Sequence, residues 1–136
     1  MAGARTVRRL TGVCDADGGF RGELAYAIGK ARGTAHCALS DLTHTGRRRR
    51  PDWDALLATL GVPFDVVHLN ERDEAVVAAS KGRTPCVLAH TDTGIVMLLG
   101  PDYLAAIGTN VLRFDQTMRE AADAEALLLP LSGLAP

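Results

Sequence analysis

The stretch RTPCVLAHTDTGIVMLLG, residues 83–100, holds two apolar runs that are separated only by TDTG at residues 91–94. A connection this short suits an antiparallel hairpin, because parallel strands need a crossover of a dozen or more residues. The stretch therefore predicts two adjacent antiparallel strands. Since strand and helix patterns alternate in the chain before it, the expected sheet is mixed.

The part of the chain before this hairpin alternates short apolar runs, typical of strands, with apolar residues at helical spacing. The clearest helix begins at Pro51, where Trp53, Leu56 and Leu60 recur on one face. The run PFDVVHLN is nearly continuous in apolar residues, as expected for a strand buried on both faces of a sheet. The predicted order is strand, helix, strand, helix, strand, helix over residues 6–14, 19–33, 35–43, 51–61, 63–70 and 71–82.

The chain after the hairpin reads as a helix over residues 101–127 with one interruption. Gly108 disfavours a continuous helix, and Thr109 or Asn110 can cap a new one with its side-chain oxygen. We therefore expect two consecutive helices here. Residues 127–136 are expected to be a C-terminal tail.

Composition and charge indicate a single domain over residues 1–136, since 47% hydrophobic residues suffice for a core without disulfides. Fifteen basic and 16 acidic residues give a net charge of −1, so no overall attraction to nucleic acid or membrane is implied. Three widely spaced cysteines do not describe a disulfide framework, and the stretch MAGARTVRRL lacks the apolar run of a signal peptide. We expect a cytoplasmic protein with reduced thiols and no membrane span.

The predicted order, βαβαβα followed by ββ and α, is similar to the thioredoxin fold over nearly the whole chain. Thr84-Pro85, directly before the first hairpin strand, resembles the cis-proline that faces the active site in that family. The resemblance implies an α/β fold with a mixed five-stranded sheet, βαβαβαββα, and helices on both faces. It also places Thr84, Pro85 and Cys86 at the rim of a substrate site, where Cys86 could meet Cys14 or Cys37 in space.

Cys37-Ala38-Leu39-Ser40 resembles the Cys-x-x-Ser of monothiol relatives of the thioredoxins. The resemblance implies Cys37 as a nucleophile, Ser40 and His44 as the residues that tune it, and Pro85 as the residue that positions the partner. The implied function is thiol redox chemistry on a small-molecule or protein thiol, as a thiol-disulfide oxidoreductase that requires no cofactor. A buried and inert Cys37 is the alternative interpretation.

The end of the first strand, VCDADGGFRGEL, resembles the Asp-Gly-Asp-Cys-x-x-Cys start of the small DCC family of thioredoxin-like proteins. Asp15 and Asp17 match its acidic residues, whereas Gly18 and Arg21 occupy its two cysteine positions. In this register the usual redox chemistry is absent, and Asp15 and Asp17 would lie beside a ligand. A plain turn explains the same residues, because Gly and Asp dominate turns for local reasons.

A metal site is a further alternative. His36, Cys37 and His44 offer imidazole and thiolate, which suit zinc or copper, and His68, His90 or Cys86 could complete the set. On a strand, however, adjacent side chains point to opposite faces, which separates the first two of these residues. We expect His68 and His90, which lie in apolar runs, to be core histidines with satisfied hydrogen bonds.

Four consecutive arginines, Arg47 to Arg50, form the strongest charge block of the chain. Because adjacent guanidiniums repel one another, we expect them in solvent, where they could bind phosphate or an acidic partner. The single tryptophan is committed to a core helix, and few other aromatics remain to stack on bases, which argues against nucleic-acid binding. A degenerate fold that serves only as an accessory or partner-binding protein is the last alternative.

Overall fold

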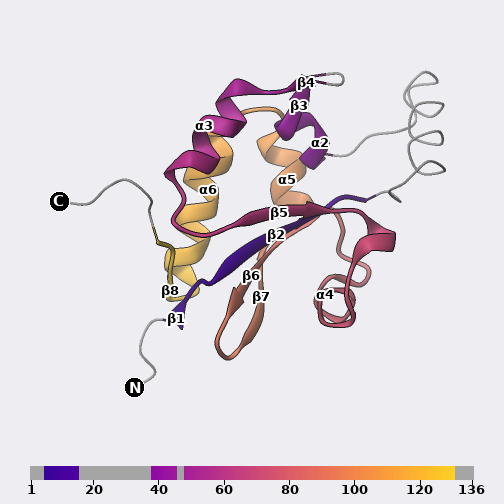
Figure 1. Cartoon of the computed structure of the whole chain (residues 1–136), viewed down its shortest axis with the longest axis vertical. Coiled ribbons are helices and arrows are strands. Elements are labelled where there is room, and N and C mark those ends of the chain that lie inside the picture. Colours follow the sequence, from indigo (N-terminus) through magenta and orange to yellow (C-terminus); the bar gives the residue numbers. More distant parts are fainter. Residues whose placement is uncertain (1–4, 16–37, 46–47, 131–136) are drawn as a thin grey trace.

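The structure is a computed structural model that describes residues 5–15, 38–45 and 48–130 (Figure 1). This part of the chain is a mixed α/β protein built on a four-stranded sheet in the order β5-β2-β6-β7. Strand β2 pairs with β5 in parallel and with β6 antiparallel, and β6 pairs antiparallel with β7. The sheet is therefore mixed, as predicted. Its strands are β2 (Arg9–Val13), β5 (Phe64–Val67), β6 (Cys86–Thr91) and β7 (Gly94–Leu99).

The predicted hairpin is confirmed, and its connection is as short as the sequence indicated. Thr91 pairs with Gly94 across the turn, so only residues 92 and 93 lie between the strands. Gly94 has a φ of 139°, which disfavours any residue with a side chain. The Thr91 hydroxyl donates a hydrogen bond of 2.9 Å to the Gly94 carbonyl oxygen, which adds to the closure of the turn.

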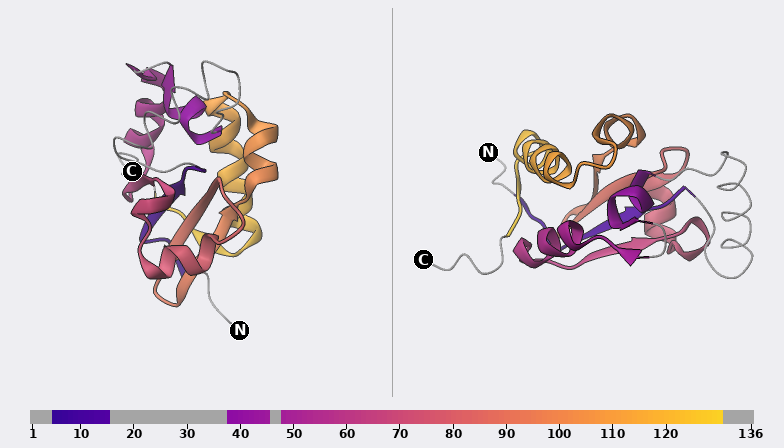
Figure 2. Two further views of the ribbon diagram at one scale, coloured as in Figure 1. Left: turned by 90° about the vertical axis from the view of Figure 1, so that its right-hand side faces the viewer. Right: turned by 90° about the horizontal axis from the view of Figure 1, so that it is seen from above.

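Helices cover the two faces of the sheet unequally (Figure 1). Because alternate strand residues point to opposite faces, Leu10 and Val87 join a large core cluster, whereas Val13 and Cys86 join a smaller one. The larger cluster receives α2, α3, α5 and α6, and the smaller one receives α4. Figure 2 shows α5 and α6 beside each other in one half of the larger layer, with α2 and α3 in the other. These helices are α2 (Ala38–Thr43), α3 (Pro51–Thr59), α4 (Glu74–Ser80), α5 (Pro101–Ile107) and α6 (Val111–Ala124).

An aromatic cluster joins α3 and α6 to the sheet. The ring centroid of Trp53 lies 5.2 Å from that of Phe64 and 5.4 Å from that of Phe114. Trp53 and Phe114 are fully buried, and aromatic pairs of this kind add roughly 0.5–1.5 kcal/mol each beyond their buried area. The prediction that Pro51 starts a core helix is confirmed, since α3 begins there and buries Trp53 and Leu56.

The break in the C-terminal helix is also confirmed. Helix α5 ends before Gly108, which has a φ of 64°, a conformation that favours glycine. Asn110 then caps α6, because its side chain accepts a hydrogen bond of 3.0 Å from the backbone N–H of Arg113. Of the two residues named as caps, Asn110 fills the role.

The strand predicted over residues 35–43 is wrong where the structure describes it, because residues 38–43 form α2. Leu39 and Leu42, three positions apart, lie on one face of a helix, and both are fully buried. Within the described residues the main sheet thus has four strands and not five. The short strands β3 (His44–Thr45) and β4 (Arg48–Arg49) form a separate pair after α2.

Strand β5 differs from its prediction in burial. It lies at an edge of the described sheet, so the run that was predicted to be buried on both faces leaves Asp65 exposed and Val66 37% exposed. The segment after it forms a 3-10 turn, η1 (Leu69–Glu71), before α4 begins. Asp73 caps α4 by accepting a hydrogen bond of 2.8 Å from the backbone N–H of Val76.

The start of the predicted C-terminal tail is packed on the body. Strand β8 (Leu127–Leu128) pairs in parallel with β1 (Arg5–Thr6), and Leu127 is buried in the larger core cluster. The end of the tail, residues 131–136, and the predicted helix over residues 19–33 lie outside the described residues.

Candidate functional site

Four of the residues predicted to bind substrate meet at one end of the sheet. The carboxyl end of β2 lies beside the start of β6, since Val13 pairs with Cys86. The peptide bond between Thr84 and Pro85 is cis, as the resemblance implied. The Thr84 hydroxyl donates a hydrogen bond of 2.8 Å to the carboxylate of Asp15, which follows β2. Asp15, Thr84, Pro85 and Cys86 therefore form a cluster that we call the Pro85 site; Asp17 lies outside the described residues.

The cysteine of the Pro85 site is poorly suited to act as a nucleophile. Cys86 is fully buried, and burial raises the pKa of its thiol to about 11, although Arg83 and Arg72 oppose the shift. Because the thiolate is the reactive form, this thiol is protonated and shielded near neutral pH.

Cys14 lies close to Cys86 along the ladder but faces the other way. Cys14 packs in the larger core cluster, whereas Cys86 packs in the smaller one on the opposite face. The sheet thus separates the two side chains, which disfavours the pairing of Cys86 with Cys14 that the sequence left open.

The Cys37 stretch is described from Ala38 onward. His36 and Cys37 lie outside the described residues, and Ser40 falls in α2. Helix α2 packs on the carboxyl half of β2, because a side-chain carbon added at Gly12 would lie 3.3 Å from Cδ1 of Leu39. The helix that follows Cys37 therefore contacts the strand that leads into the Pro85 site.

His44, predicted to tune Cys37 or bind metal, is half-buried at the start of β3. Its Nδ1 shares a hydrogen bond of 2.6 Å with the hydroxyl of Thr43. Among the residues of known placement, no three His, Cys, Asp or Glu side chains gather closely enough to hold a metal ion.

The other two histidines are engaged differently from each other. The expectation of a core histidine is wrong for His68, whose side chain is 42% exposed and whose Nδ1 lies 2.7 Å from a carboxylate oxygen of Glu71. The backbone N–H of His68 also donates to this carboxylate and is the main cause of the lowered pKa of Glu71. His90 is half-buried and shares a hydrogen bond of 2.8 Å between its Nε2 and Oγ1 of Thr11, as a satisfied histidine should.

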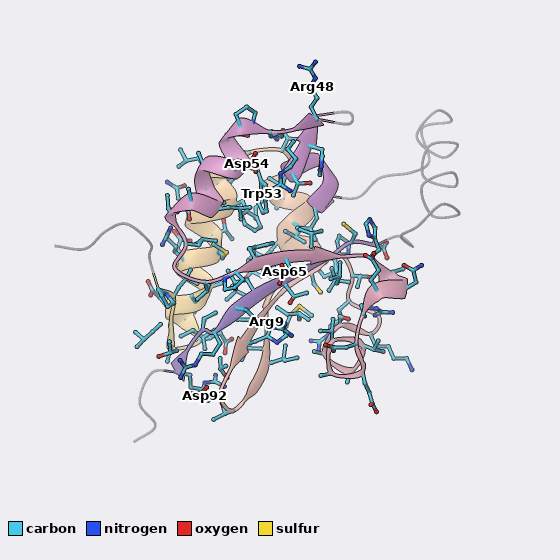
Figure 3. The ribbon with its side chains drawn as sticks, viewed as in Figure 1. Arg9, Arg48, Trp53, Asp54, Asp65 and Asp92 are labelled. Atoms are coloured by element: carbon cyan, nitrogen blue, oxygen red, sulfur yellow. The ribbon has the colours of Figure 1, made fainter. Side chains whose placement is uncertain are left out.

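The arginine block is only partly solvated, in contrast to its prediction. Arg49 donates from two nitrogens to one carboxylate oxygen of Asp54, at 2.9 and 2.7 Å. Arg50 donates to Asp52 and to the carbonyl oxygen of Thr109, which ties the start of α3 to the α5–α6 turn. Figure 3 shows Arg48 pointing away from the body, and it is exposed. Residue 47 lies outside the described part.

Sequence reasoning missed a cavity of about 430 Å³ on the α4 side of the sheet. Arg9, Thr11 and Asp65 line it from the strands, and Arg72 and Asp73 line it from the two positions between η1 and α4. A signal was present in the sequence, since Arg9 and Asp65 are charged residues inside otherwise apolar strands. A second cavity of about 650 Å³ lies between α3 and α6.

The helices that the structure describes include none with the length and apolar character needed to cross a membrane. Comparison with protein-family models, with curated protein sequences and with solved structures finds no match for this chain.

Proposed function

We propose that this chain is a thioredoxin-like protein that acts in thiol redox chemistry, on a small-molecule or protein thiol, through Cys37. The observation that carries the fold assignment is the Pro85 site. A cis-proline opens the strand β6, which runs antiparallel to its neighbour β2, and β2 in turn is parallel to β5. This strand order, with β6 as the reversed strand, agrees with the thioredoxin-like arrangement that the sequence resembles.

The strand beside Pro85 is β2, which supports the register in which the first strand leads into the site and resembles the DCC family. In that register Asp15 matches an acidic residue of the DCC family, and the hydrogen bond from Thr84 holds its carboxylate beside the proline. The cysteine positions of that family are occupied by Gly18 and Arg21. Any thiol chemistry at this site must therefore come from a cysteine elsewhere in the chain.

Cys37 is the best candidate for that role. Cys14 and Cys86 are both buried, and the pKa of Cys86 is raised. Cys37 directly precedes α2 in the sequence. Leu39 of α2 packs on Gly12 of β2, the strand that leads into the Pro85 site.

The proposed chemistry is thiol-disulfide exchange. The Cys37 thiolate attacks one sulfur of a disulfide substrate, forms a mixed disulfide with it and releases the other sulfur as a thiolate. A second small thiol then attacks the mixed disulfide, restores Cys37 and leaves as a new disulfide, so no metal or organic cofactor is required.

Alkylation kinetics test this proposal. In the native wild-type protein we expect one thiol to react with iodoacetamide, with a pH midpoint below the ordinary value of about 8.5. The reaction should disappear in Cys37→Ser and persist in the double variant Cys14→Ser/Cys86→Ser. A midpoint at or above about 8.5, or no reaction until the protein is unfolded, would refute the redox role.

The second candidate function is that of a non-catalytic protein that binds a metal, a cofactor or a small molecule. The hydrogen-bonded pair of Asp15 and Thr84 favours this function, because the pair offers polar groups to a ligand without a thiol. In its metal form the ligands would be His36, Cys37 and His44, with zinc or copper as the ion. Metal content of protein prepared with excess zinc or copper, compared with His44→Ala, tests this form. A stoichiometric metal that the variant loses supports it, and no bound metal in the wild type excludes it.

A further inference from the structure

The cavity on the α4 side of the sheet shares no lining residue with the Pro85 site and is lined largely by charged residues. Helix α4 packs over the end of the sheet that holds Val13 and Cys86. Toward the other end, the face is left to Arg9 and Thr11 of β2 and to Asp65 of β5, and the cavity of about 430 Å³ opens there. Cavities of this size hold small molecules.

The strand register brings opposite charges to this face. Thr11 is the direct partner of Asp65, and Arg9 precedes Thr11 by two residues, so all three point to the same side. Figure 3 shows Arg9 and Asp65 on the neighbouring strands β2 and β5. Thr11 forms a buried floor between them, and its hydroxyl is held by His90.

Most of the other polar groups around the cavity already have partners. Glu71 accepts from the backbone and side chain of His68, and Asp73 caps α4. Arg72 donates to the carbonyl oxygen of Leu69 and to the hydroxyl of Ser80. These bonds fix the walls of the cavity.

Arg9 and Asp65 differ from these wall residues. Neither side chain forms a hydrogen bond or an ion pair with any residue in the described ranges, although both face the cavity and both residues are exposed. A guanidinium and a carboxylate are therefore available to a ligand at two separate points. Between them and α4, Val67 and Val76 supply an apolar wall.

We propose that this cavity binds a small zwitterion of the aliphatic amino acid class. The ligand carboxylate would accept two parallel hydrogen bonds from Arg9, the ammonium group would donate to Asp65, and the aliphatic side chain would lie against Val67 and Val76. A phosphate or another multiply charged anion fits less well, because three carboxylates and two guanidiniums line the cavity: Asp65, Glu71, Asp73, Arg9 and Arg72. This inference does not depend on the redox proposal, since it uses no cysteine.

A titration followed by ¹H–¹⁵N NMR tests the proposal with three probes: L-leucine, N-acetyl-L-leucine and L-leucinamide. With L-leucine we expect the amide chemical shifts of the residues that line the cavity to change and to reach saturation. Each blocked compound should bind at least about ten-fold more weakly, because each lacks one of the two charges.

Variants then assign each charge to its residue. Arg9→Gln should weaken the binding of L-leucine about ten-fold or more but leave the affinity for L-leucinamide, which has no carboxylate, nearly unchanged. Asp65→Asn should also weaken the binding of L-leucine about ten-fold or more, but it should leave the affinity for N-acetyl-L-leucine, which has no ammonium group, nearly unchanged. Arg48→Gln and Asp102→Asn remove the same charges at exposed positions that do not line the cavity, and they should leave all three affinities unchanged.

Three outcomes would overturn the proposal: no saturable shifts with L-leucine, shifts confined to other parts of the protein, or equal effects of the cavity variants and their controls. Both cavity residues are exposed, so their substitution should preserve the fold, and the dispersion of the NMR spectrum verifies this directly.

Discussion

The packing of α2 on β2 predicts an energetic coupling between Gly12 and Leu39. An added methyl group at Gly12 would lie 3.3 Å from Cδ1 of Leu39 and 3.2 Å from Cε1 of Phe64. Both distances are shorter than ordinary van der Waals contact, so Gly12→Ala forces the neighbouring side chains to move. Gly12 has no positive φ, so the backbone itself accepts alanine.

The magnitudes follow from the burial of these residues. Overpacking of a core typically costs about 1–3 kcal/mol, and the reduced freedom of the unfolded chain returns about 0.4–1 kcal/mol for a Gly→Ala change. We therefore expect Gly12→Ala to lower the free energy of unfolding by about 1 kcal/mol. Leu39 is fully buried, so Leu39→Ala should lower it by about 3 kcal/mol through lost transfer energy and a cavity.

The double variant distinguishes direct contact from general destabilisation. Once Leu39 is shortened, the alanine at position 12 loses its clash on that side and fills part of the cavity. The double variant should then be more stable than additivity predicts by about 1 kcal/mol, which is within the range of coupling energies for touching residues.

Urea unfolding of the wild type, both single variants and the double variant gives this coupling energy. As a matched control, Gly12→Ala is combined with Val76→Ala, because Val76 is buried on the opposite face of the sheet. That pair should be additive within about 0.5 kcal/mol. Additivity of the Gly12 and Leu39 changes as well would mean that α2 does not rest on β2 as described.

Two further predictions concern the cap of α6 and the half-buried His90. Asn110→Ala should lower the free energy of unfolding by about 1 kcal/mol because it removes the cap of α6, whereas Thr109→Ala should change it by less than about 0.5 kcal/mol. Urea unfolding of the two variants measures this difference, and equal effects would contradict the assignment of the cap. Burial, assisted by the nearby charge of Arg9, lowers the pKa of His90 below its ordinary 6.5, so the unfolded state takes up its proton first on acidification. The free energy of unfolding should therefore fall as the pH drops below about 6.5, and it should fall less in the His90→Gln variant than in the wild type. A pKa of His90 at or above about 6.5, measured by NMR in the folded protein, would contradict this prediction.

Much of the local structure was predictable because short-range chemistry determines it. The hairpin follows from a connection too short for anything else, and α3 follows from a proline start and one apolar face. The break before α6 follows from Gly108 and a capping asparagine. In each case the residues that decide the structure lie within a few positions of one another.

The candidate site was predictable in part. The sequence indicated Asp15, Thr84, Pro85 and Cys86, but their meeting depends on the pairing of β2 with β6, and the Asp15–Thr84 hydrogen bond spans 69 positions. The role of Cys37 stays a prediction.

Other features were decided only when distant parts of the chain came together. A short apolar run such as ALSDLT satisfies a buried strand or a buried helix equally well, and the packing of Leu39 on Gly12 selects the helix. The edge position of β5 and the hydrogen bond from Arg50 to the carbonyl oxygen of Thr109, 59 positions away, likewise depend on neighbours that no local pattern specifies.

The sequence by itself therefore determined where α3, the hairpin and the break between α5 and α6 lie, since backbone propensity, capping and connection length act over a few residues. The tertiary structure alone decided which strand adjoins the cis-proline, which cysteines are buried and which charges face the cavity. The physical reason is that strand order, burial and the pairing of charges depend on contacts between residues far apart in the chain, which the periodicity of any one segment does not encode.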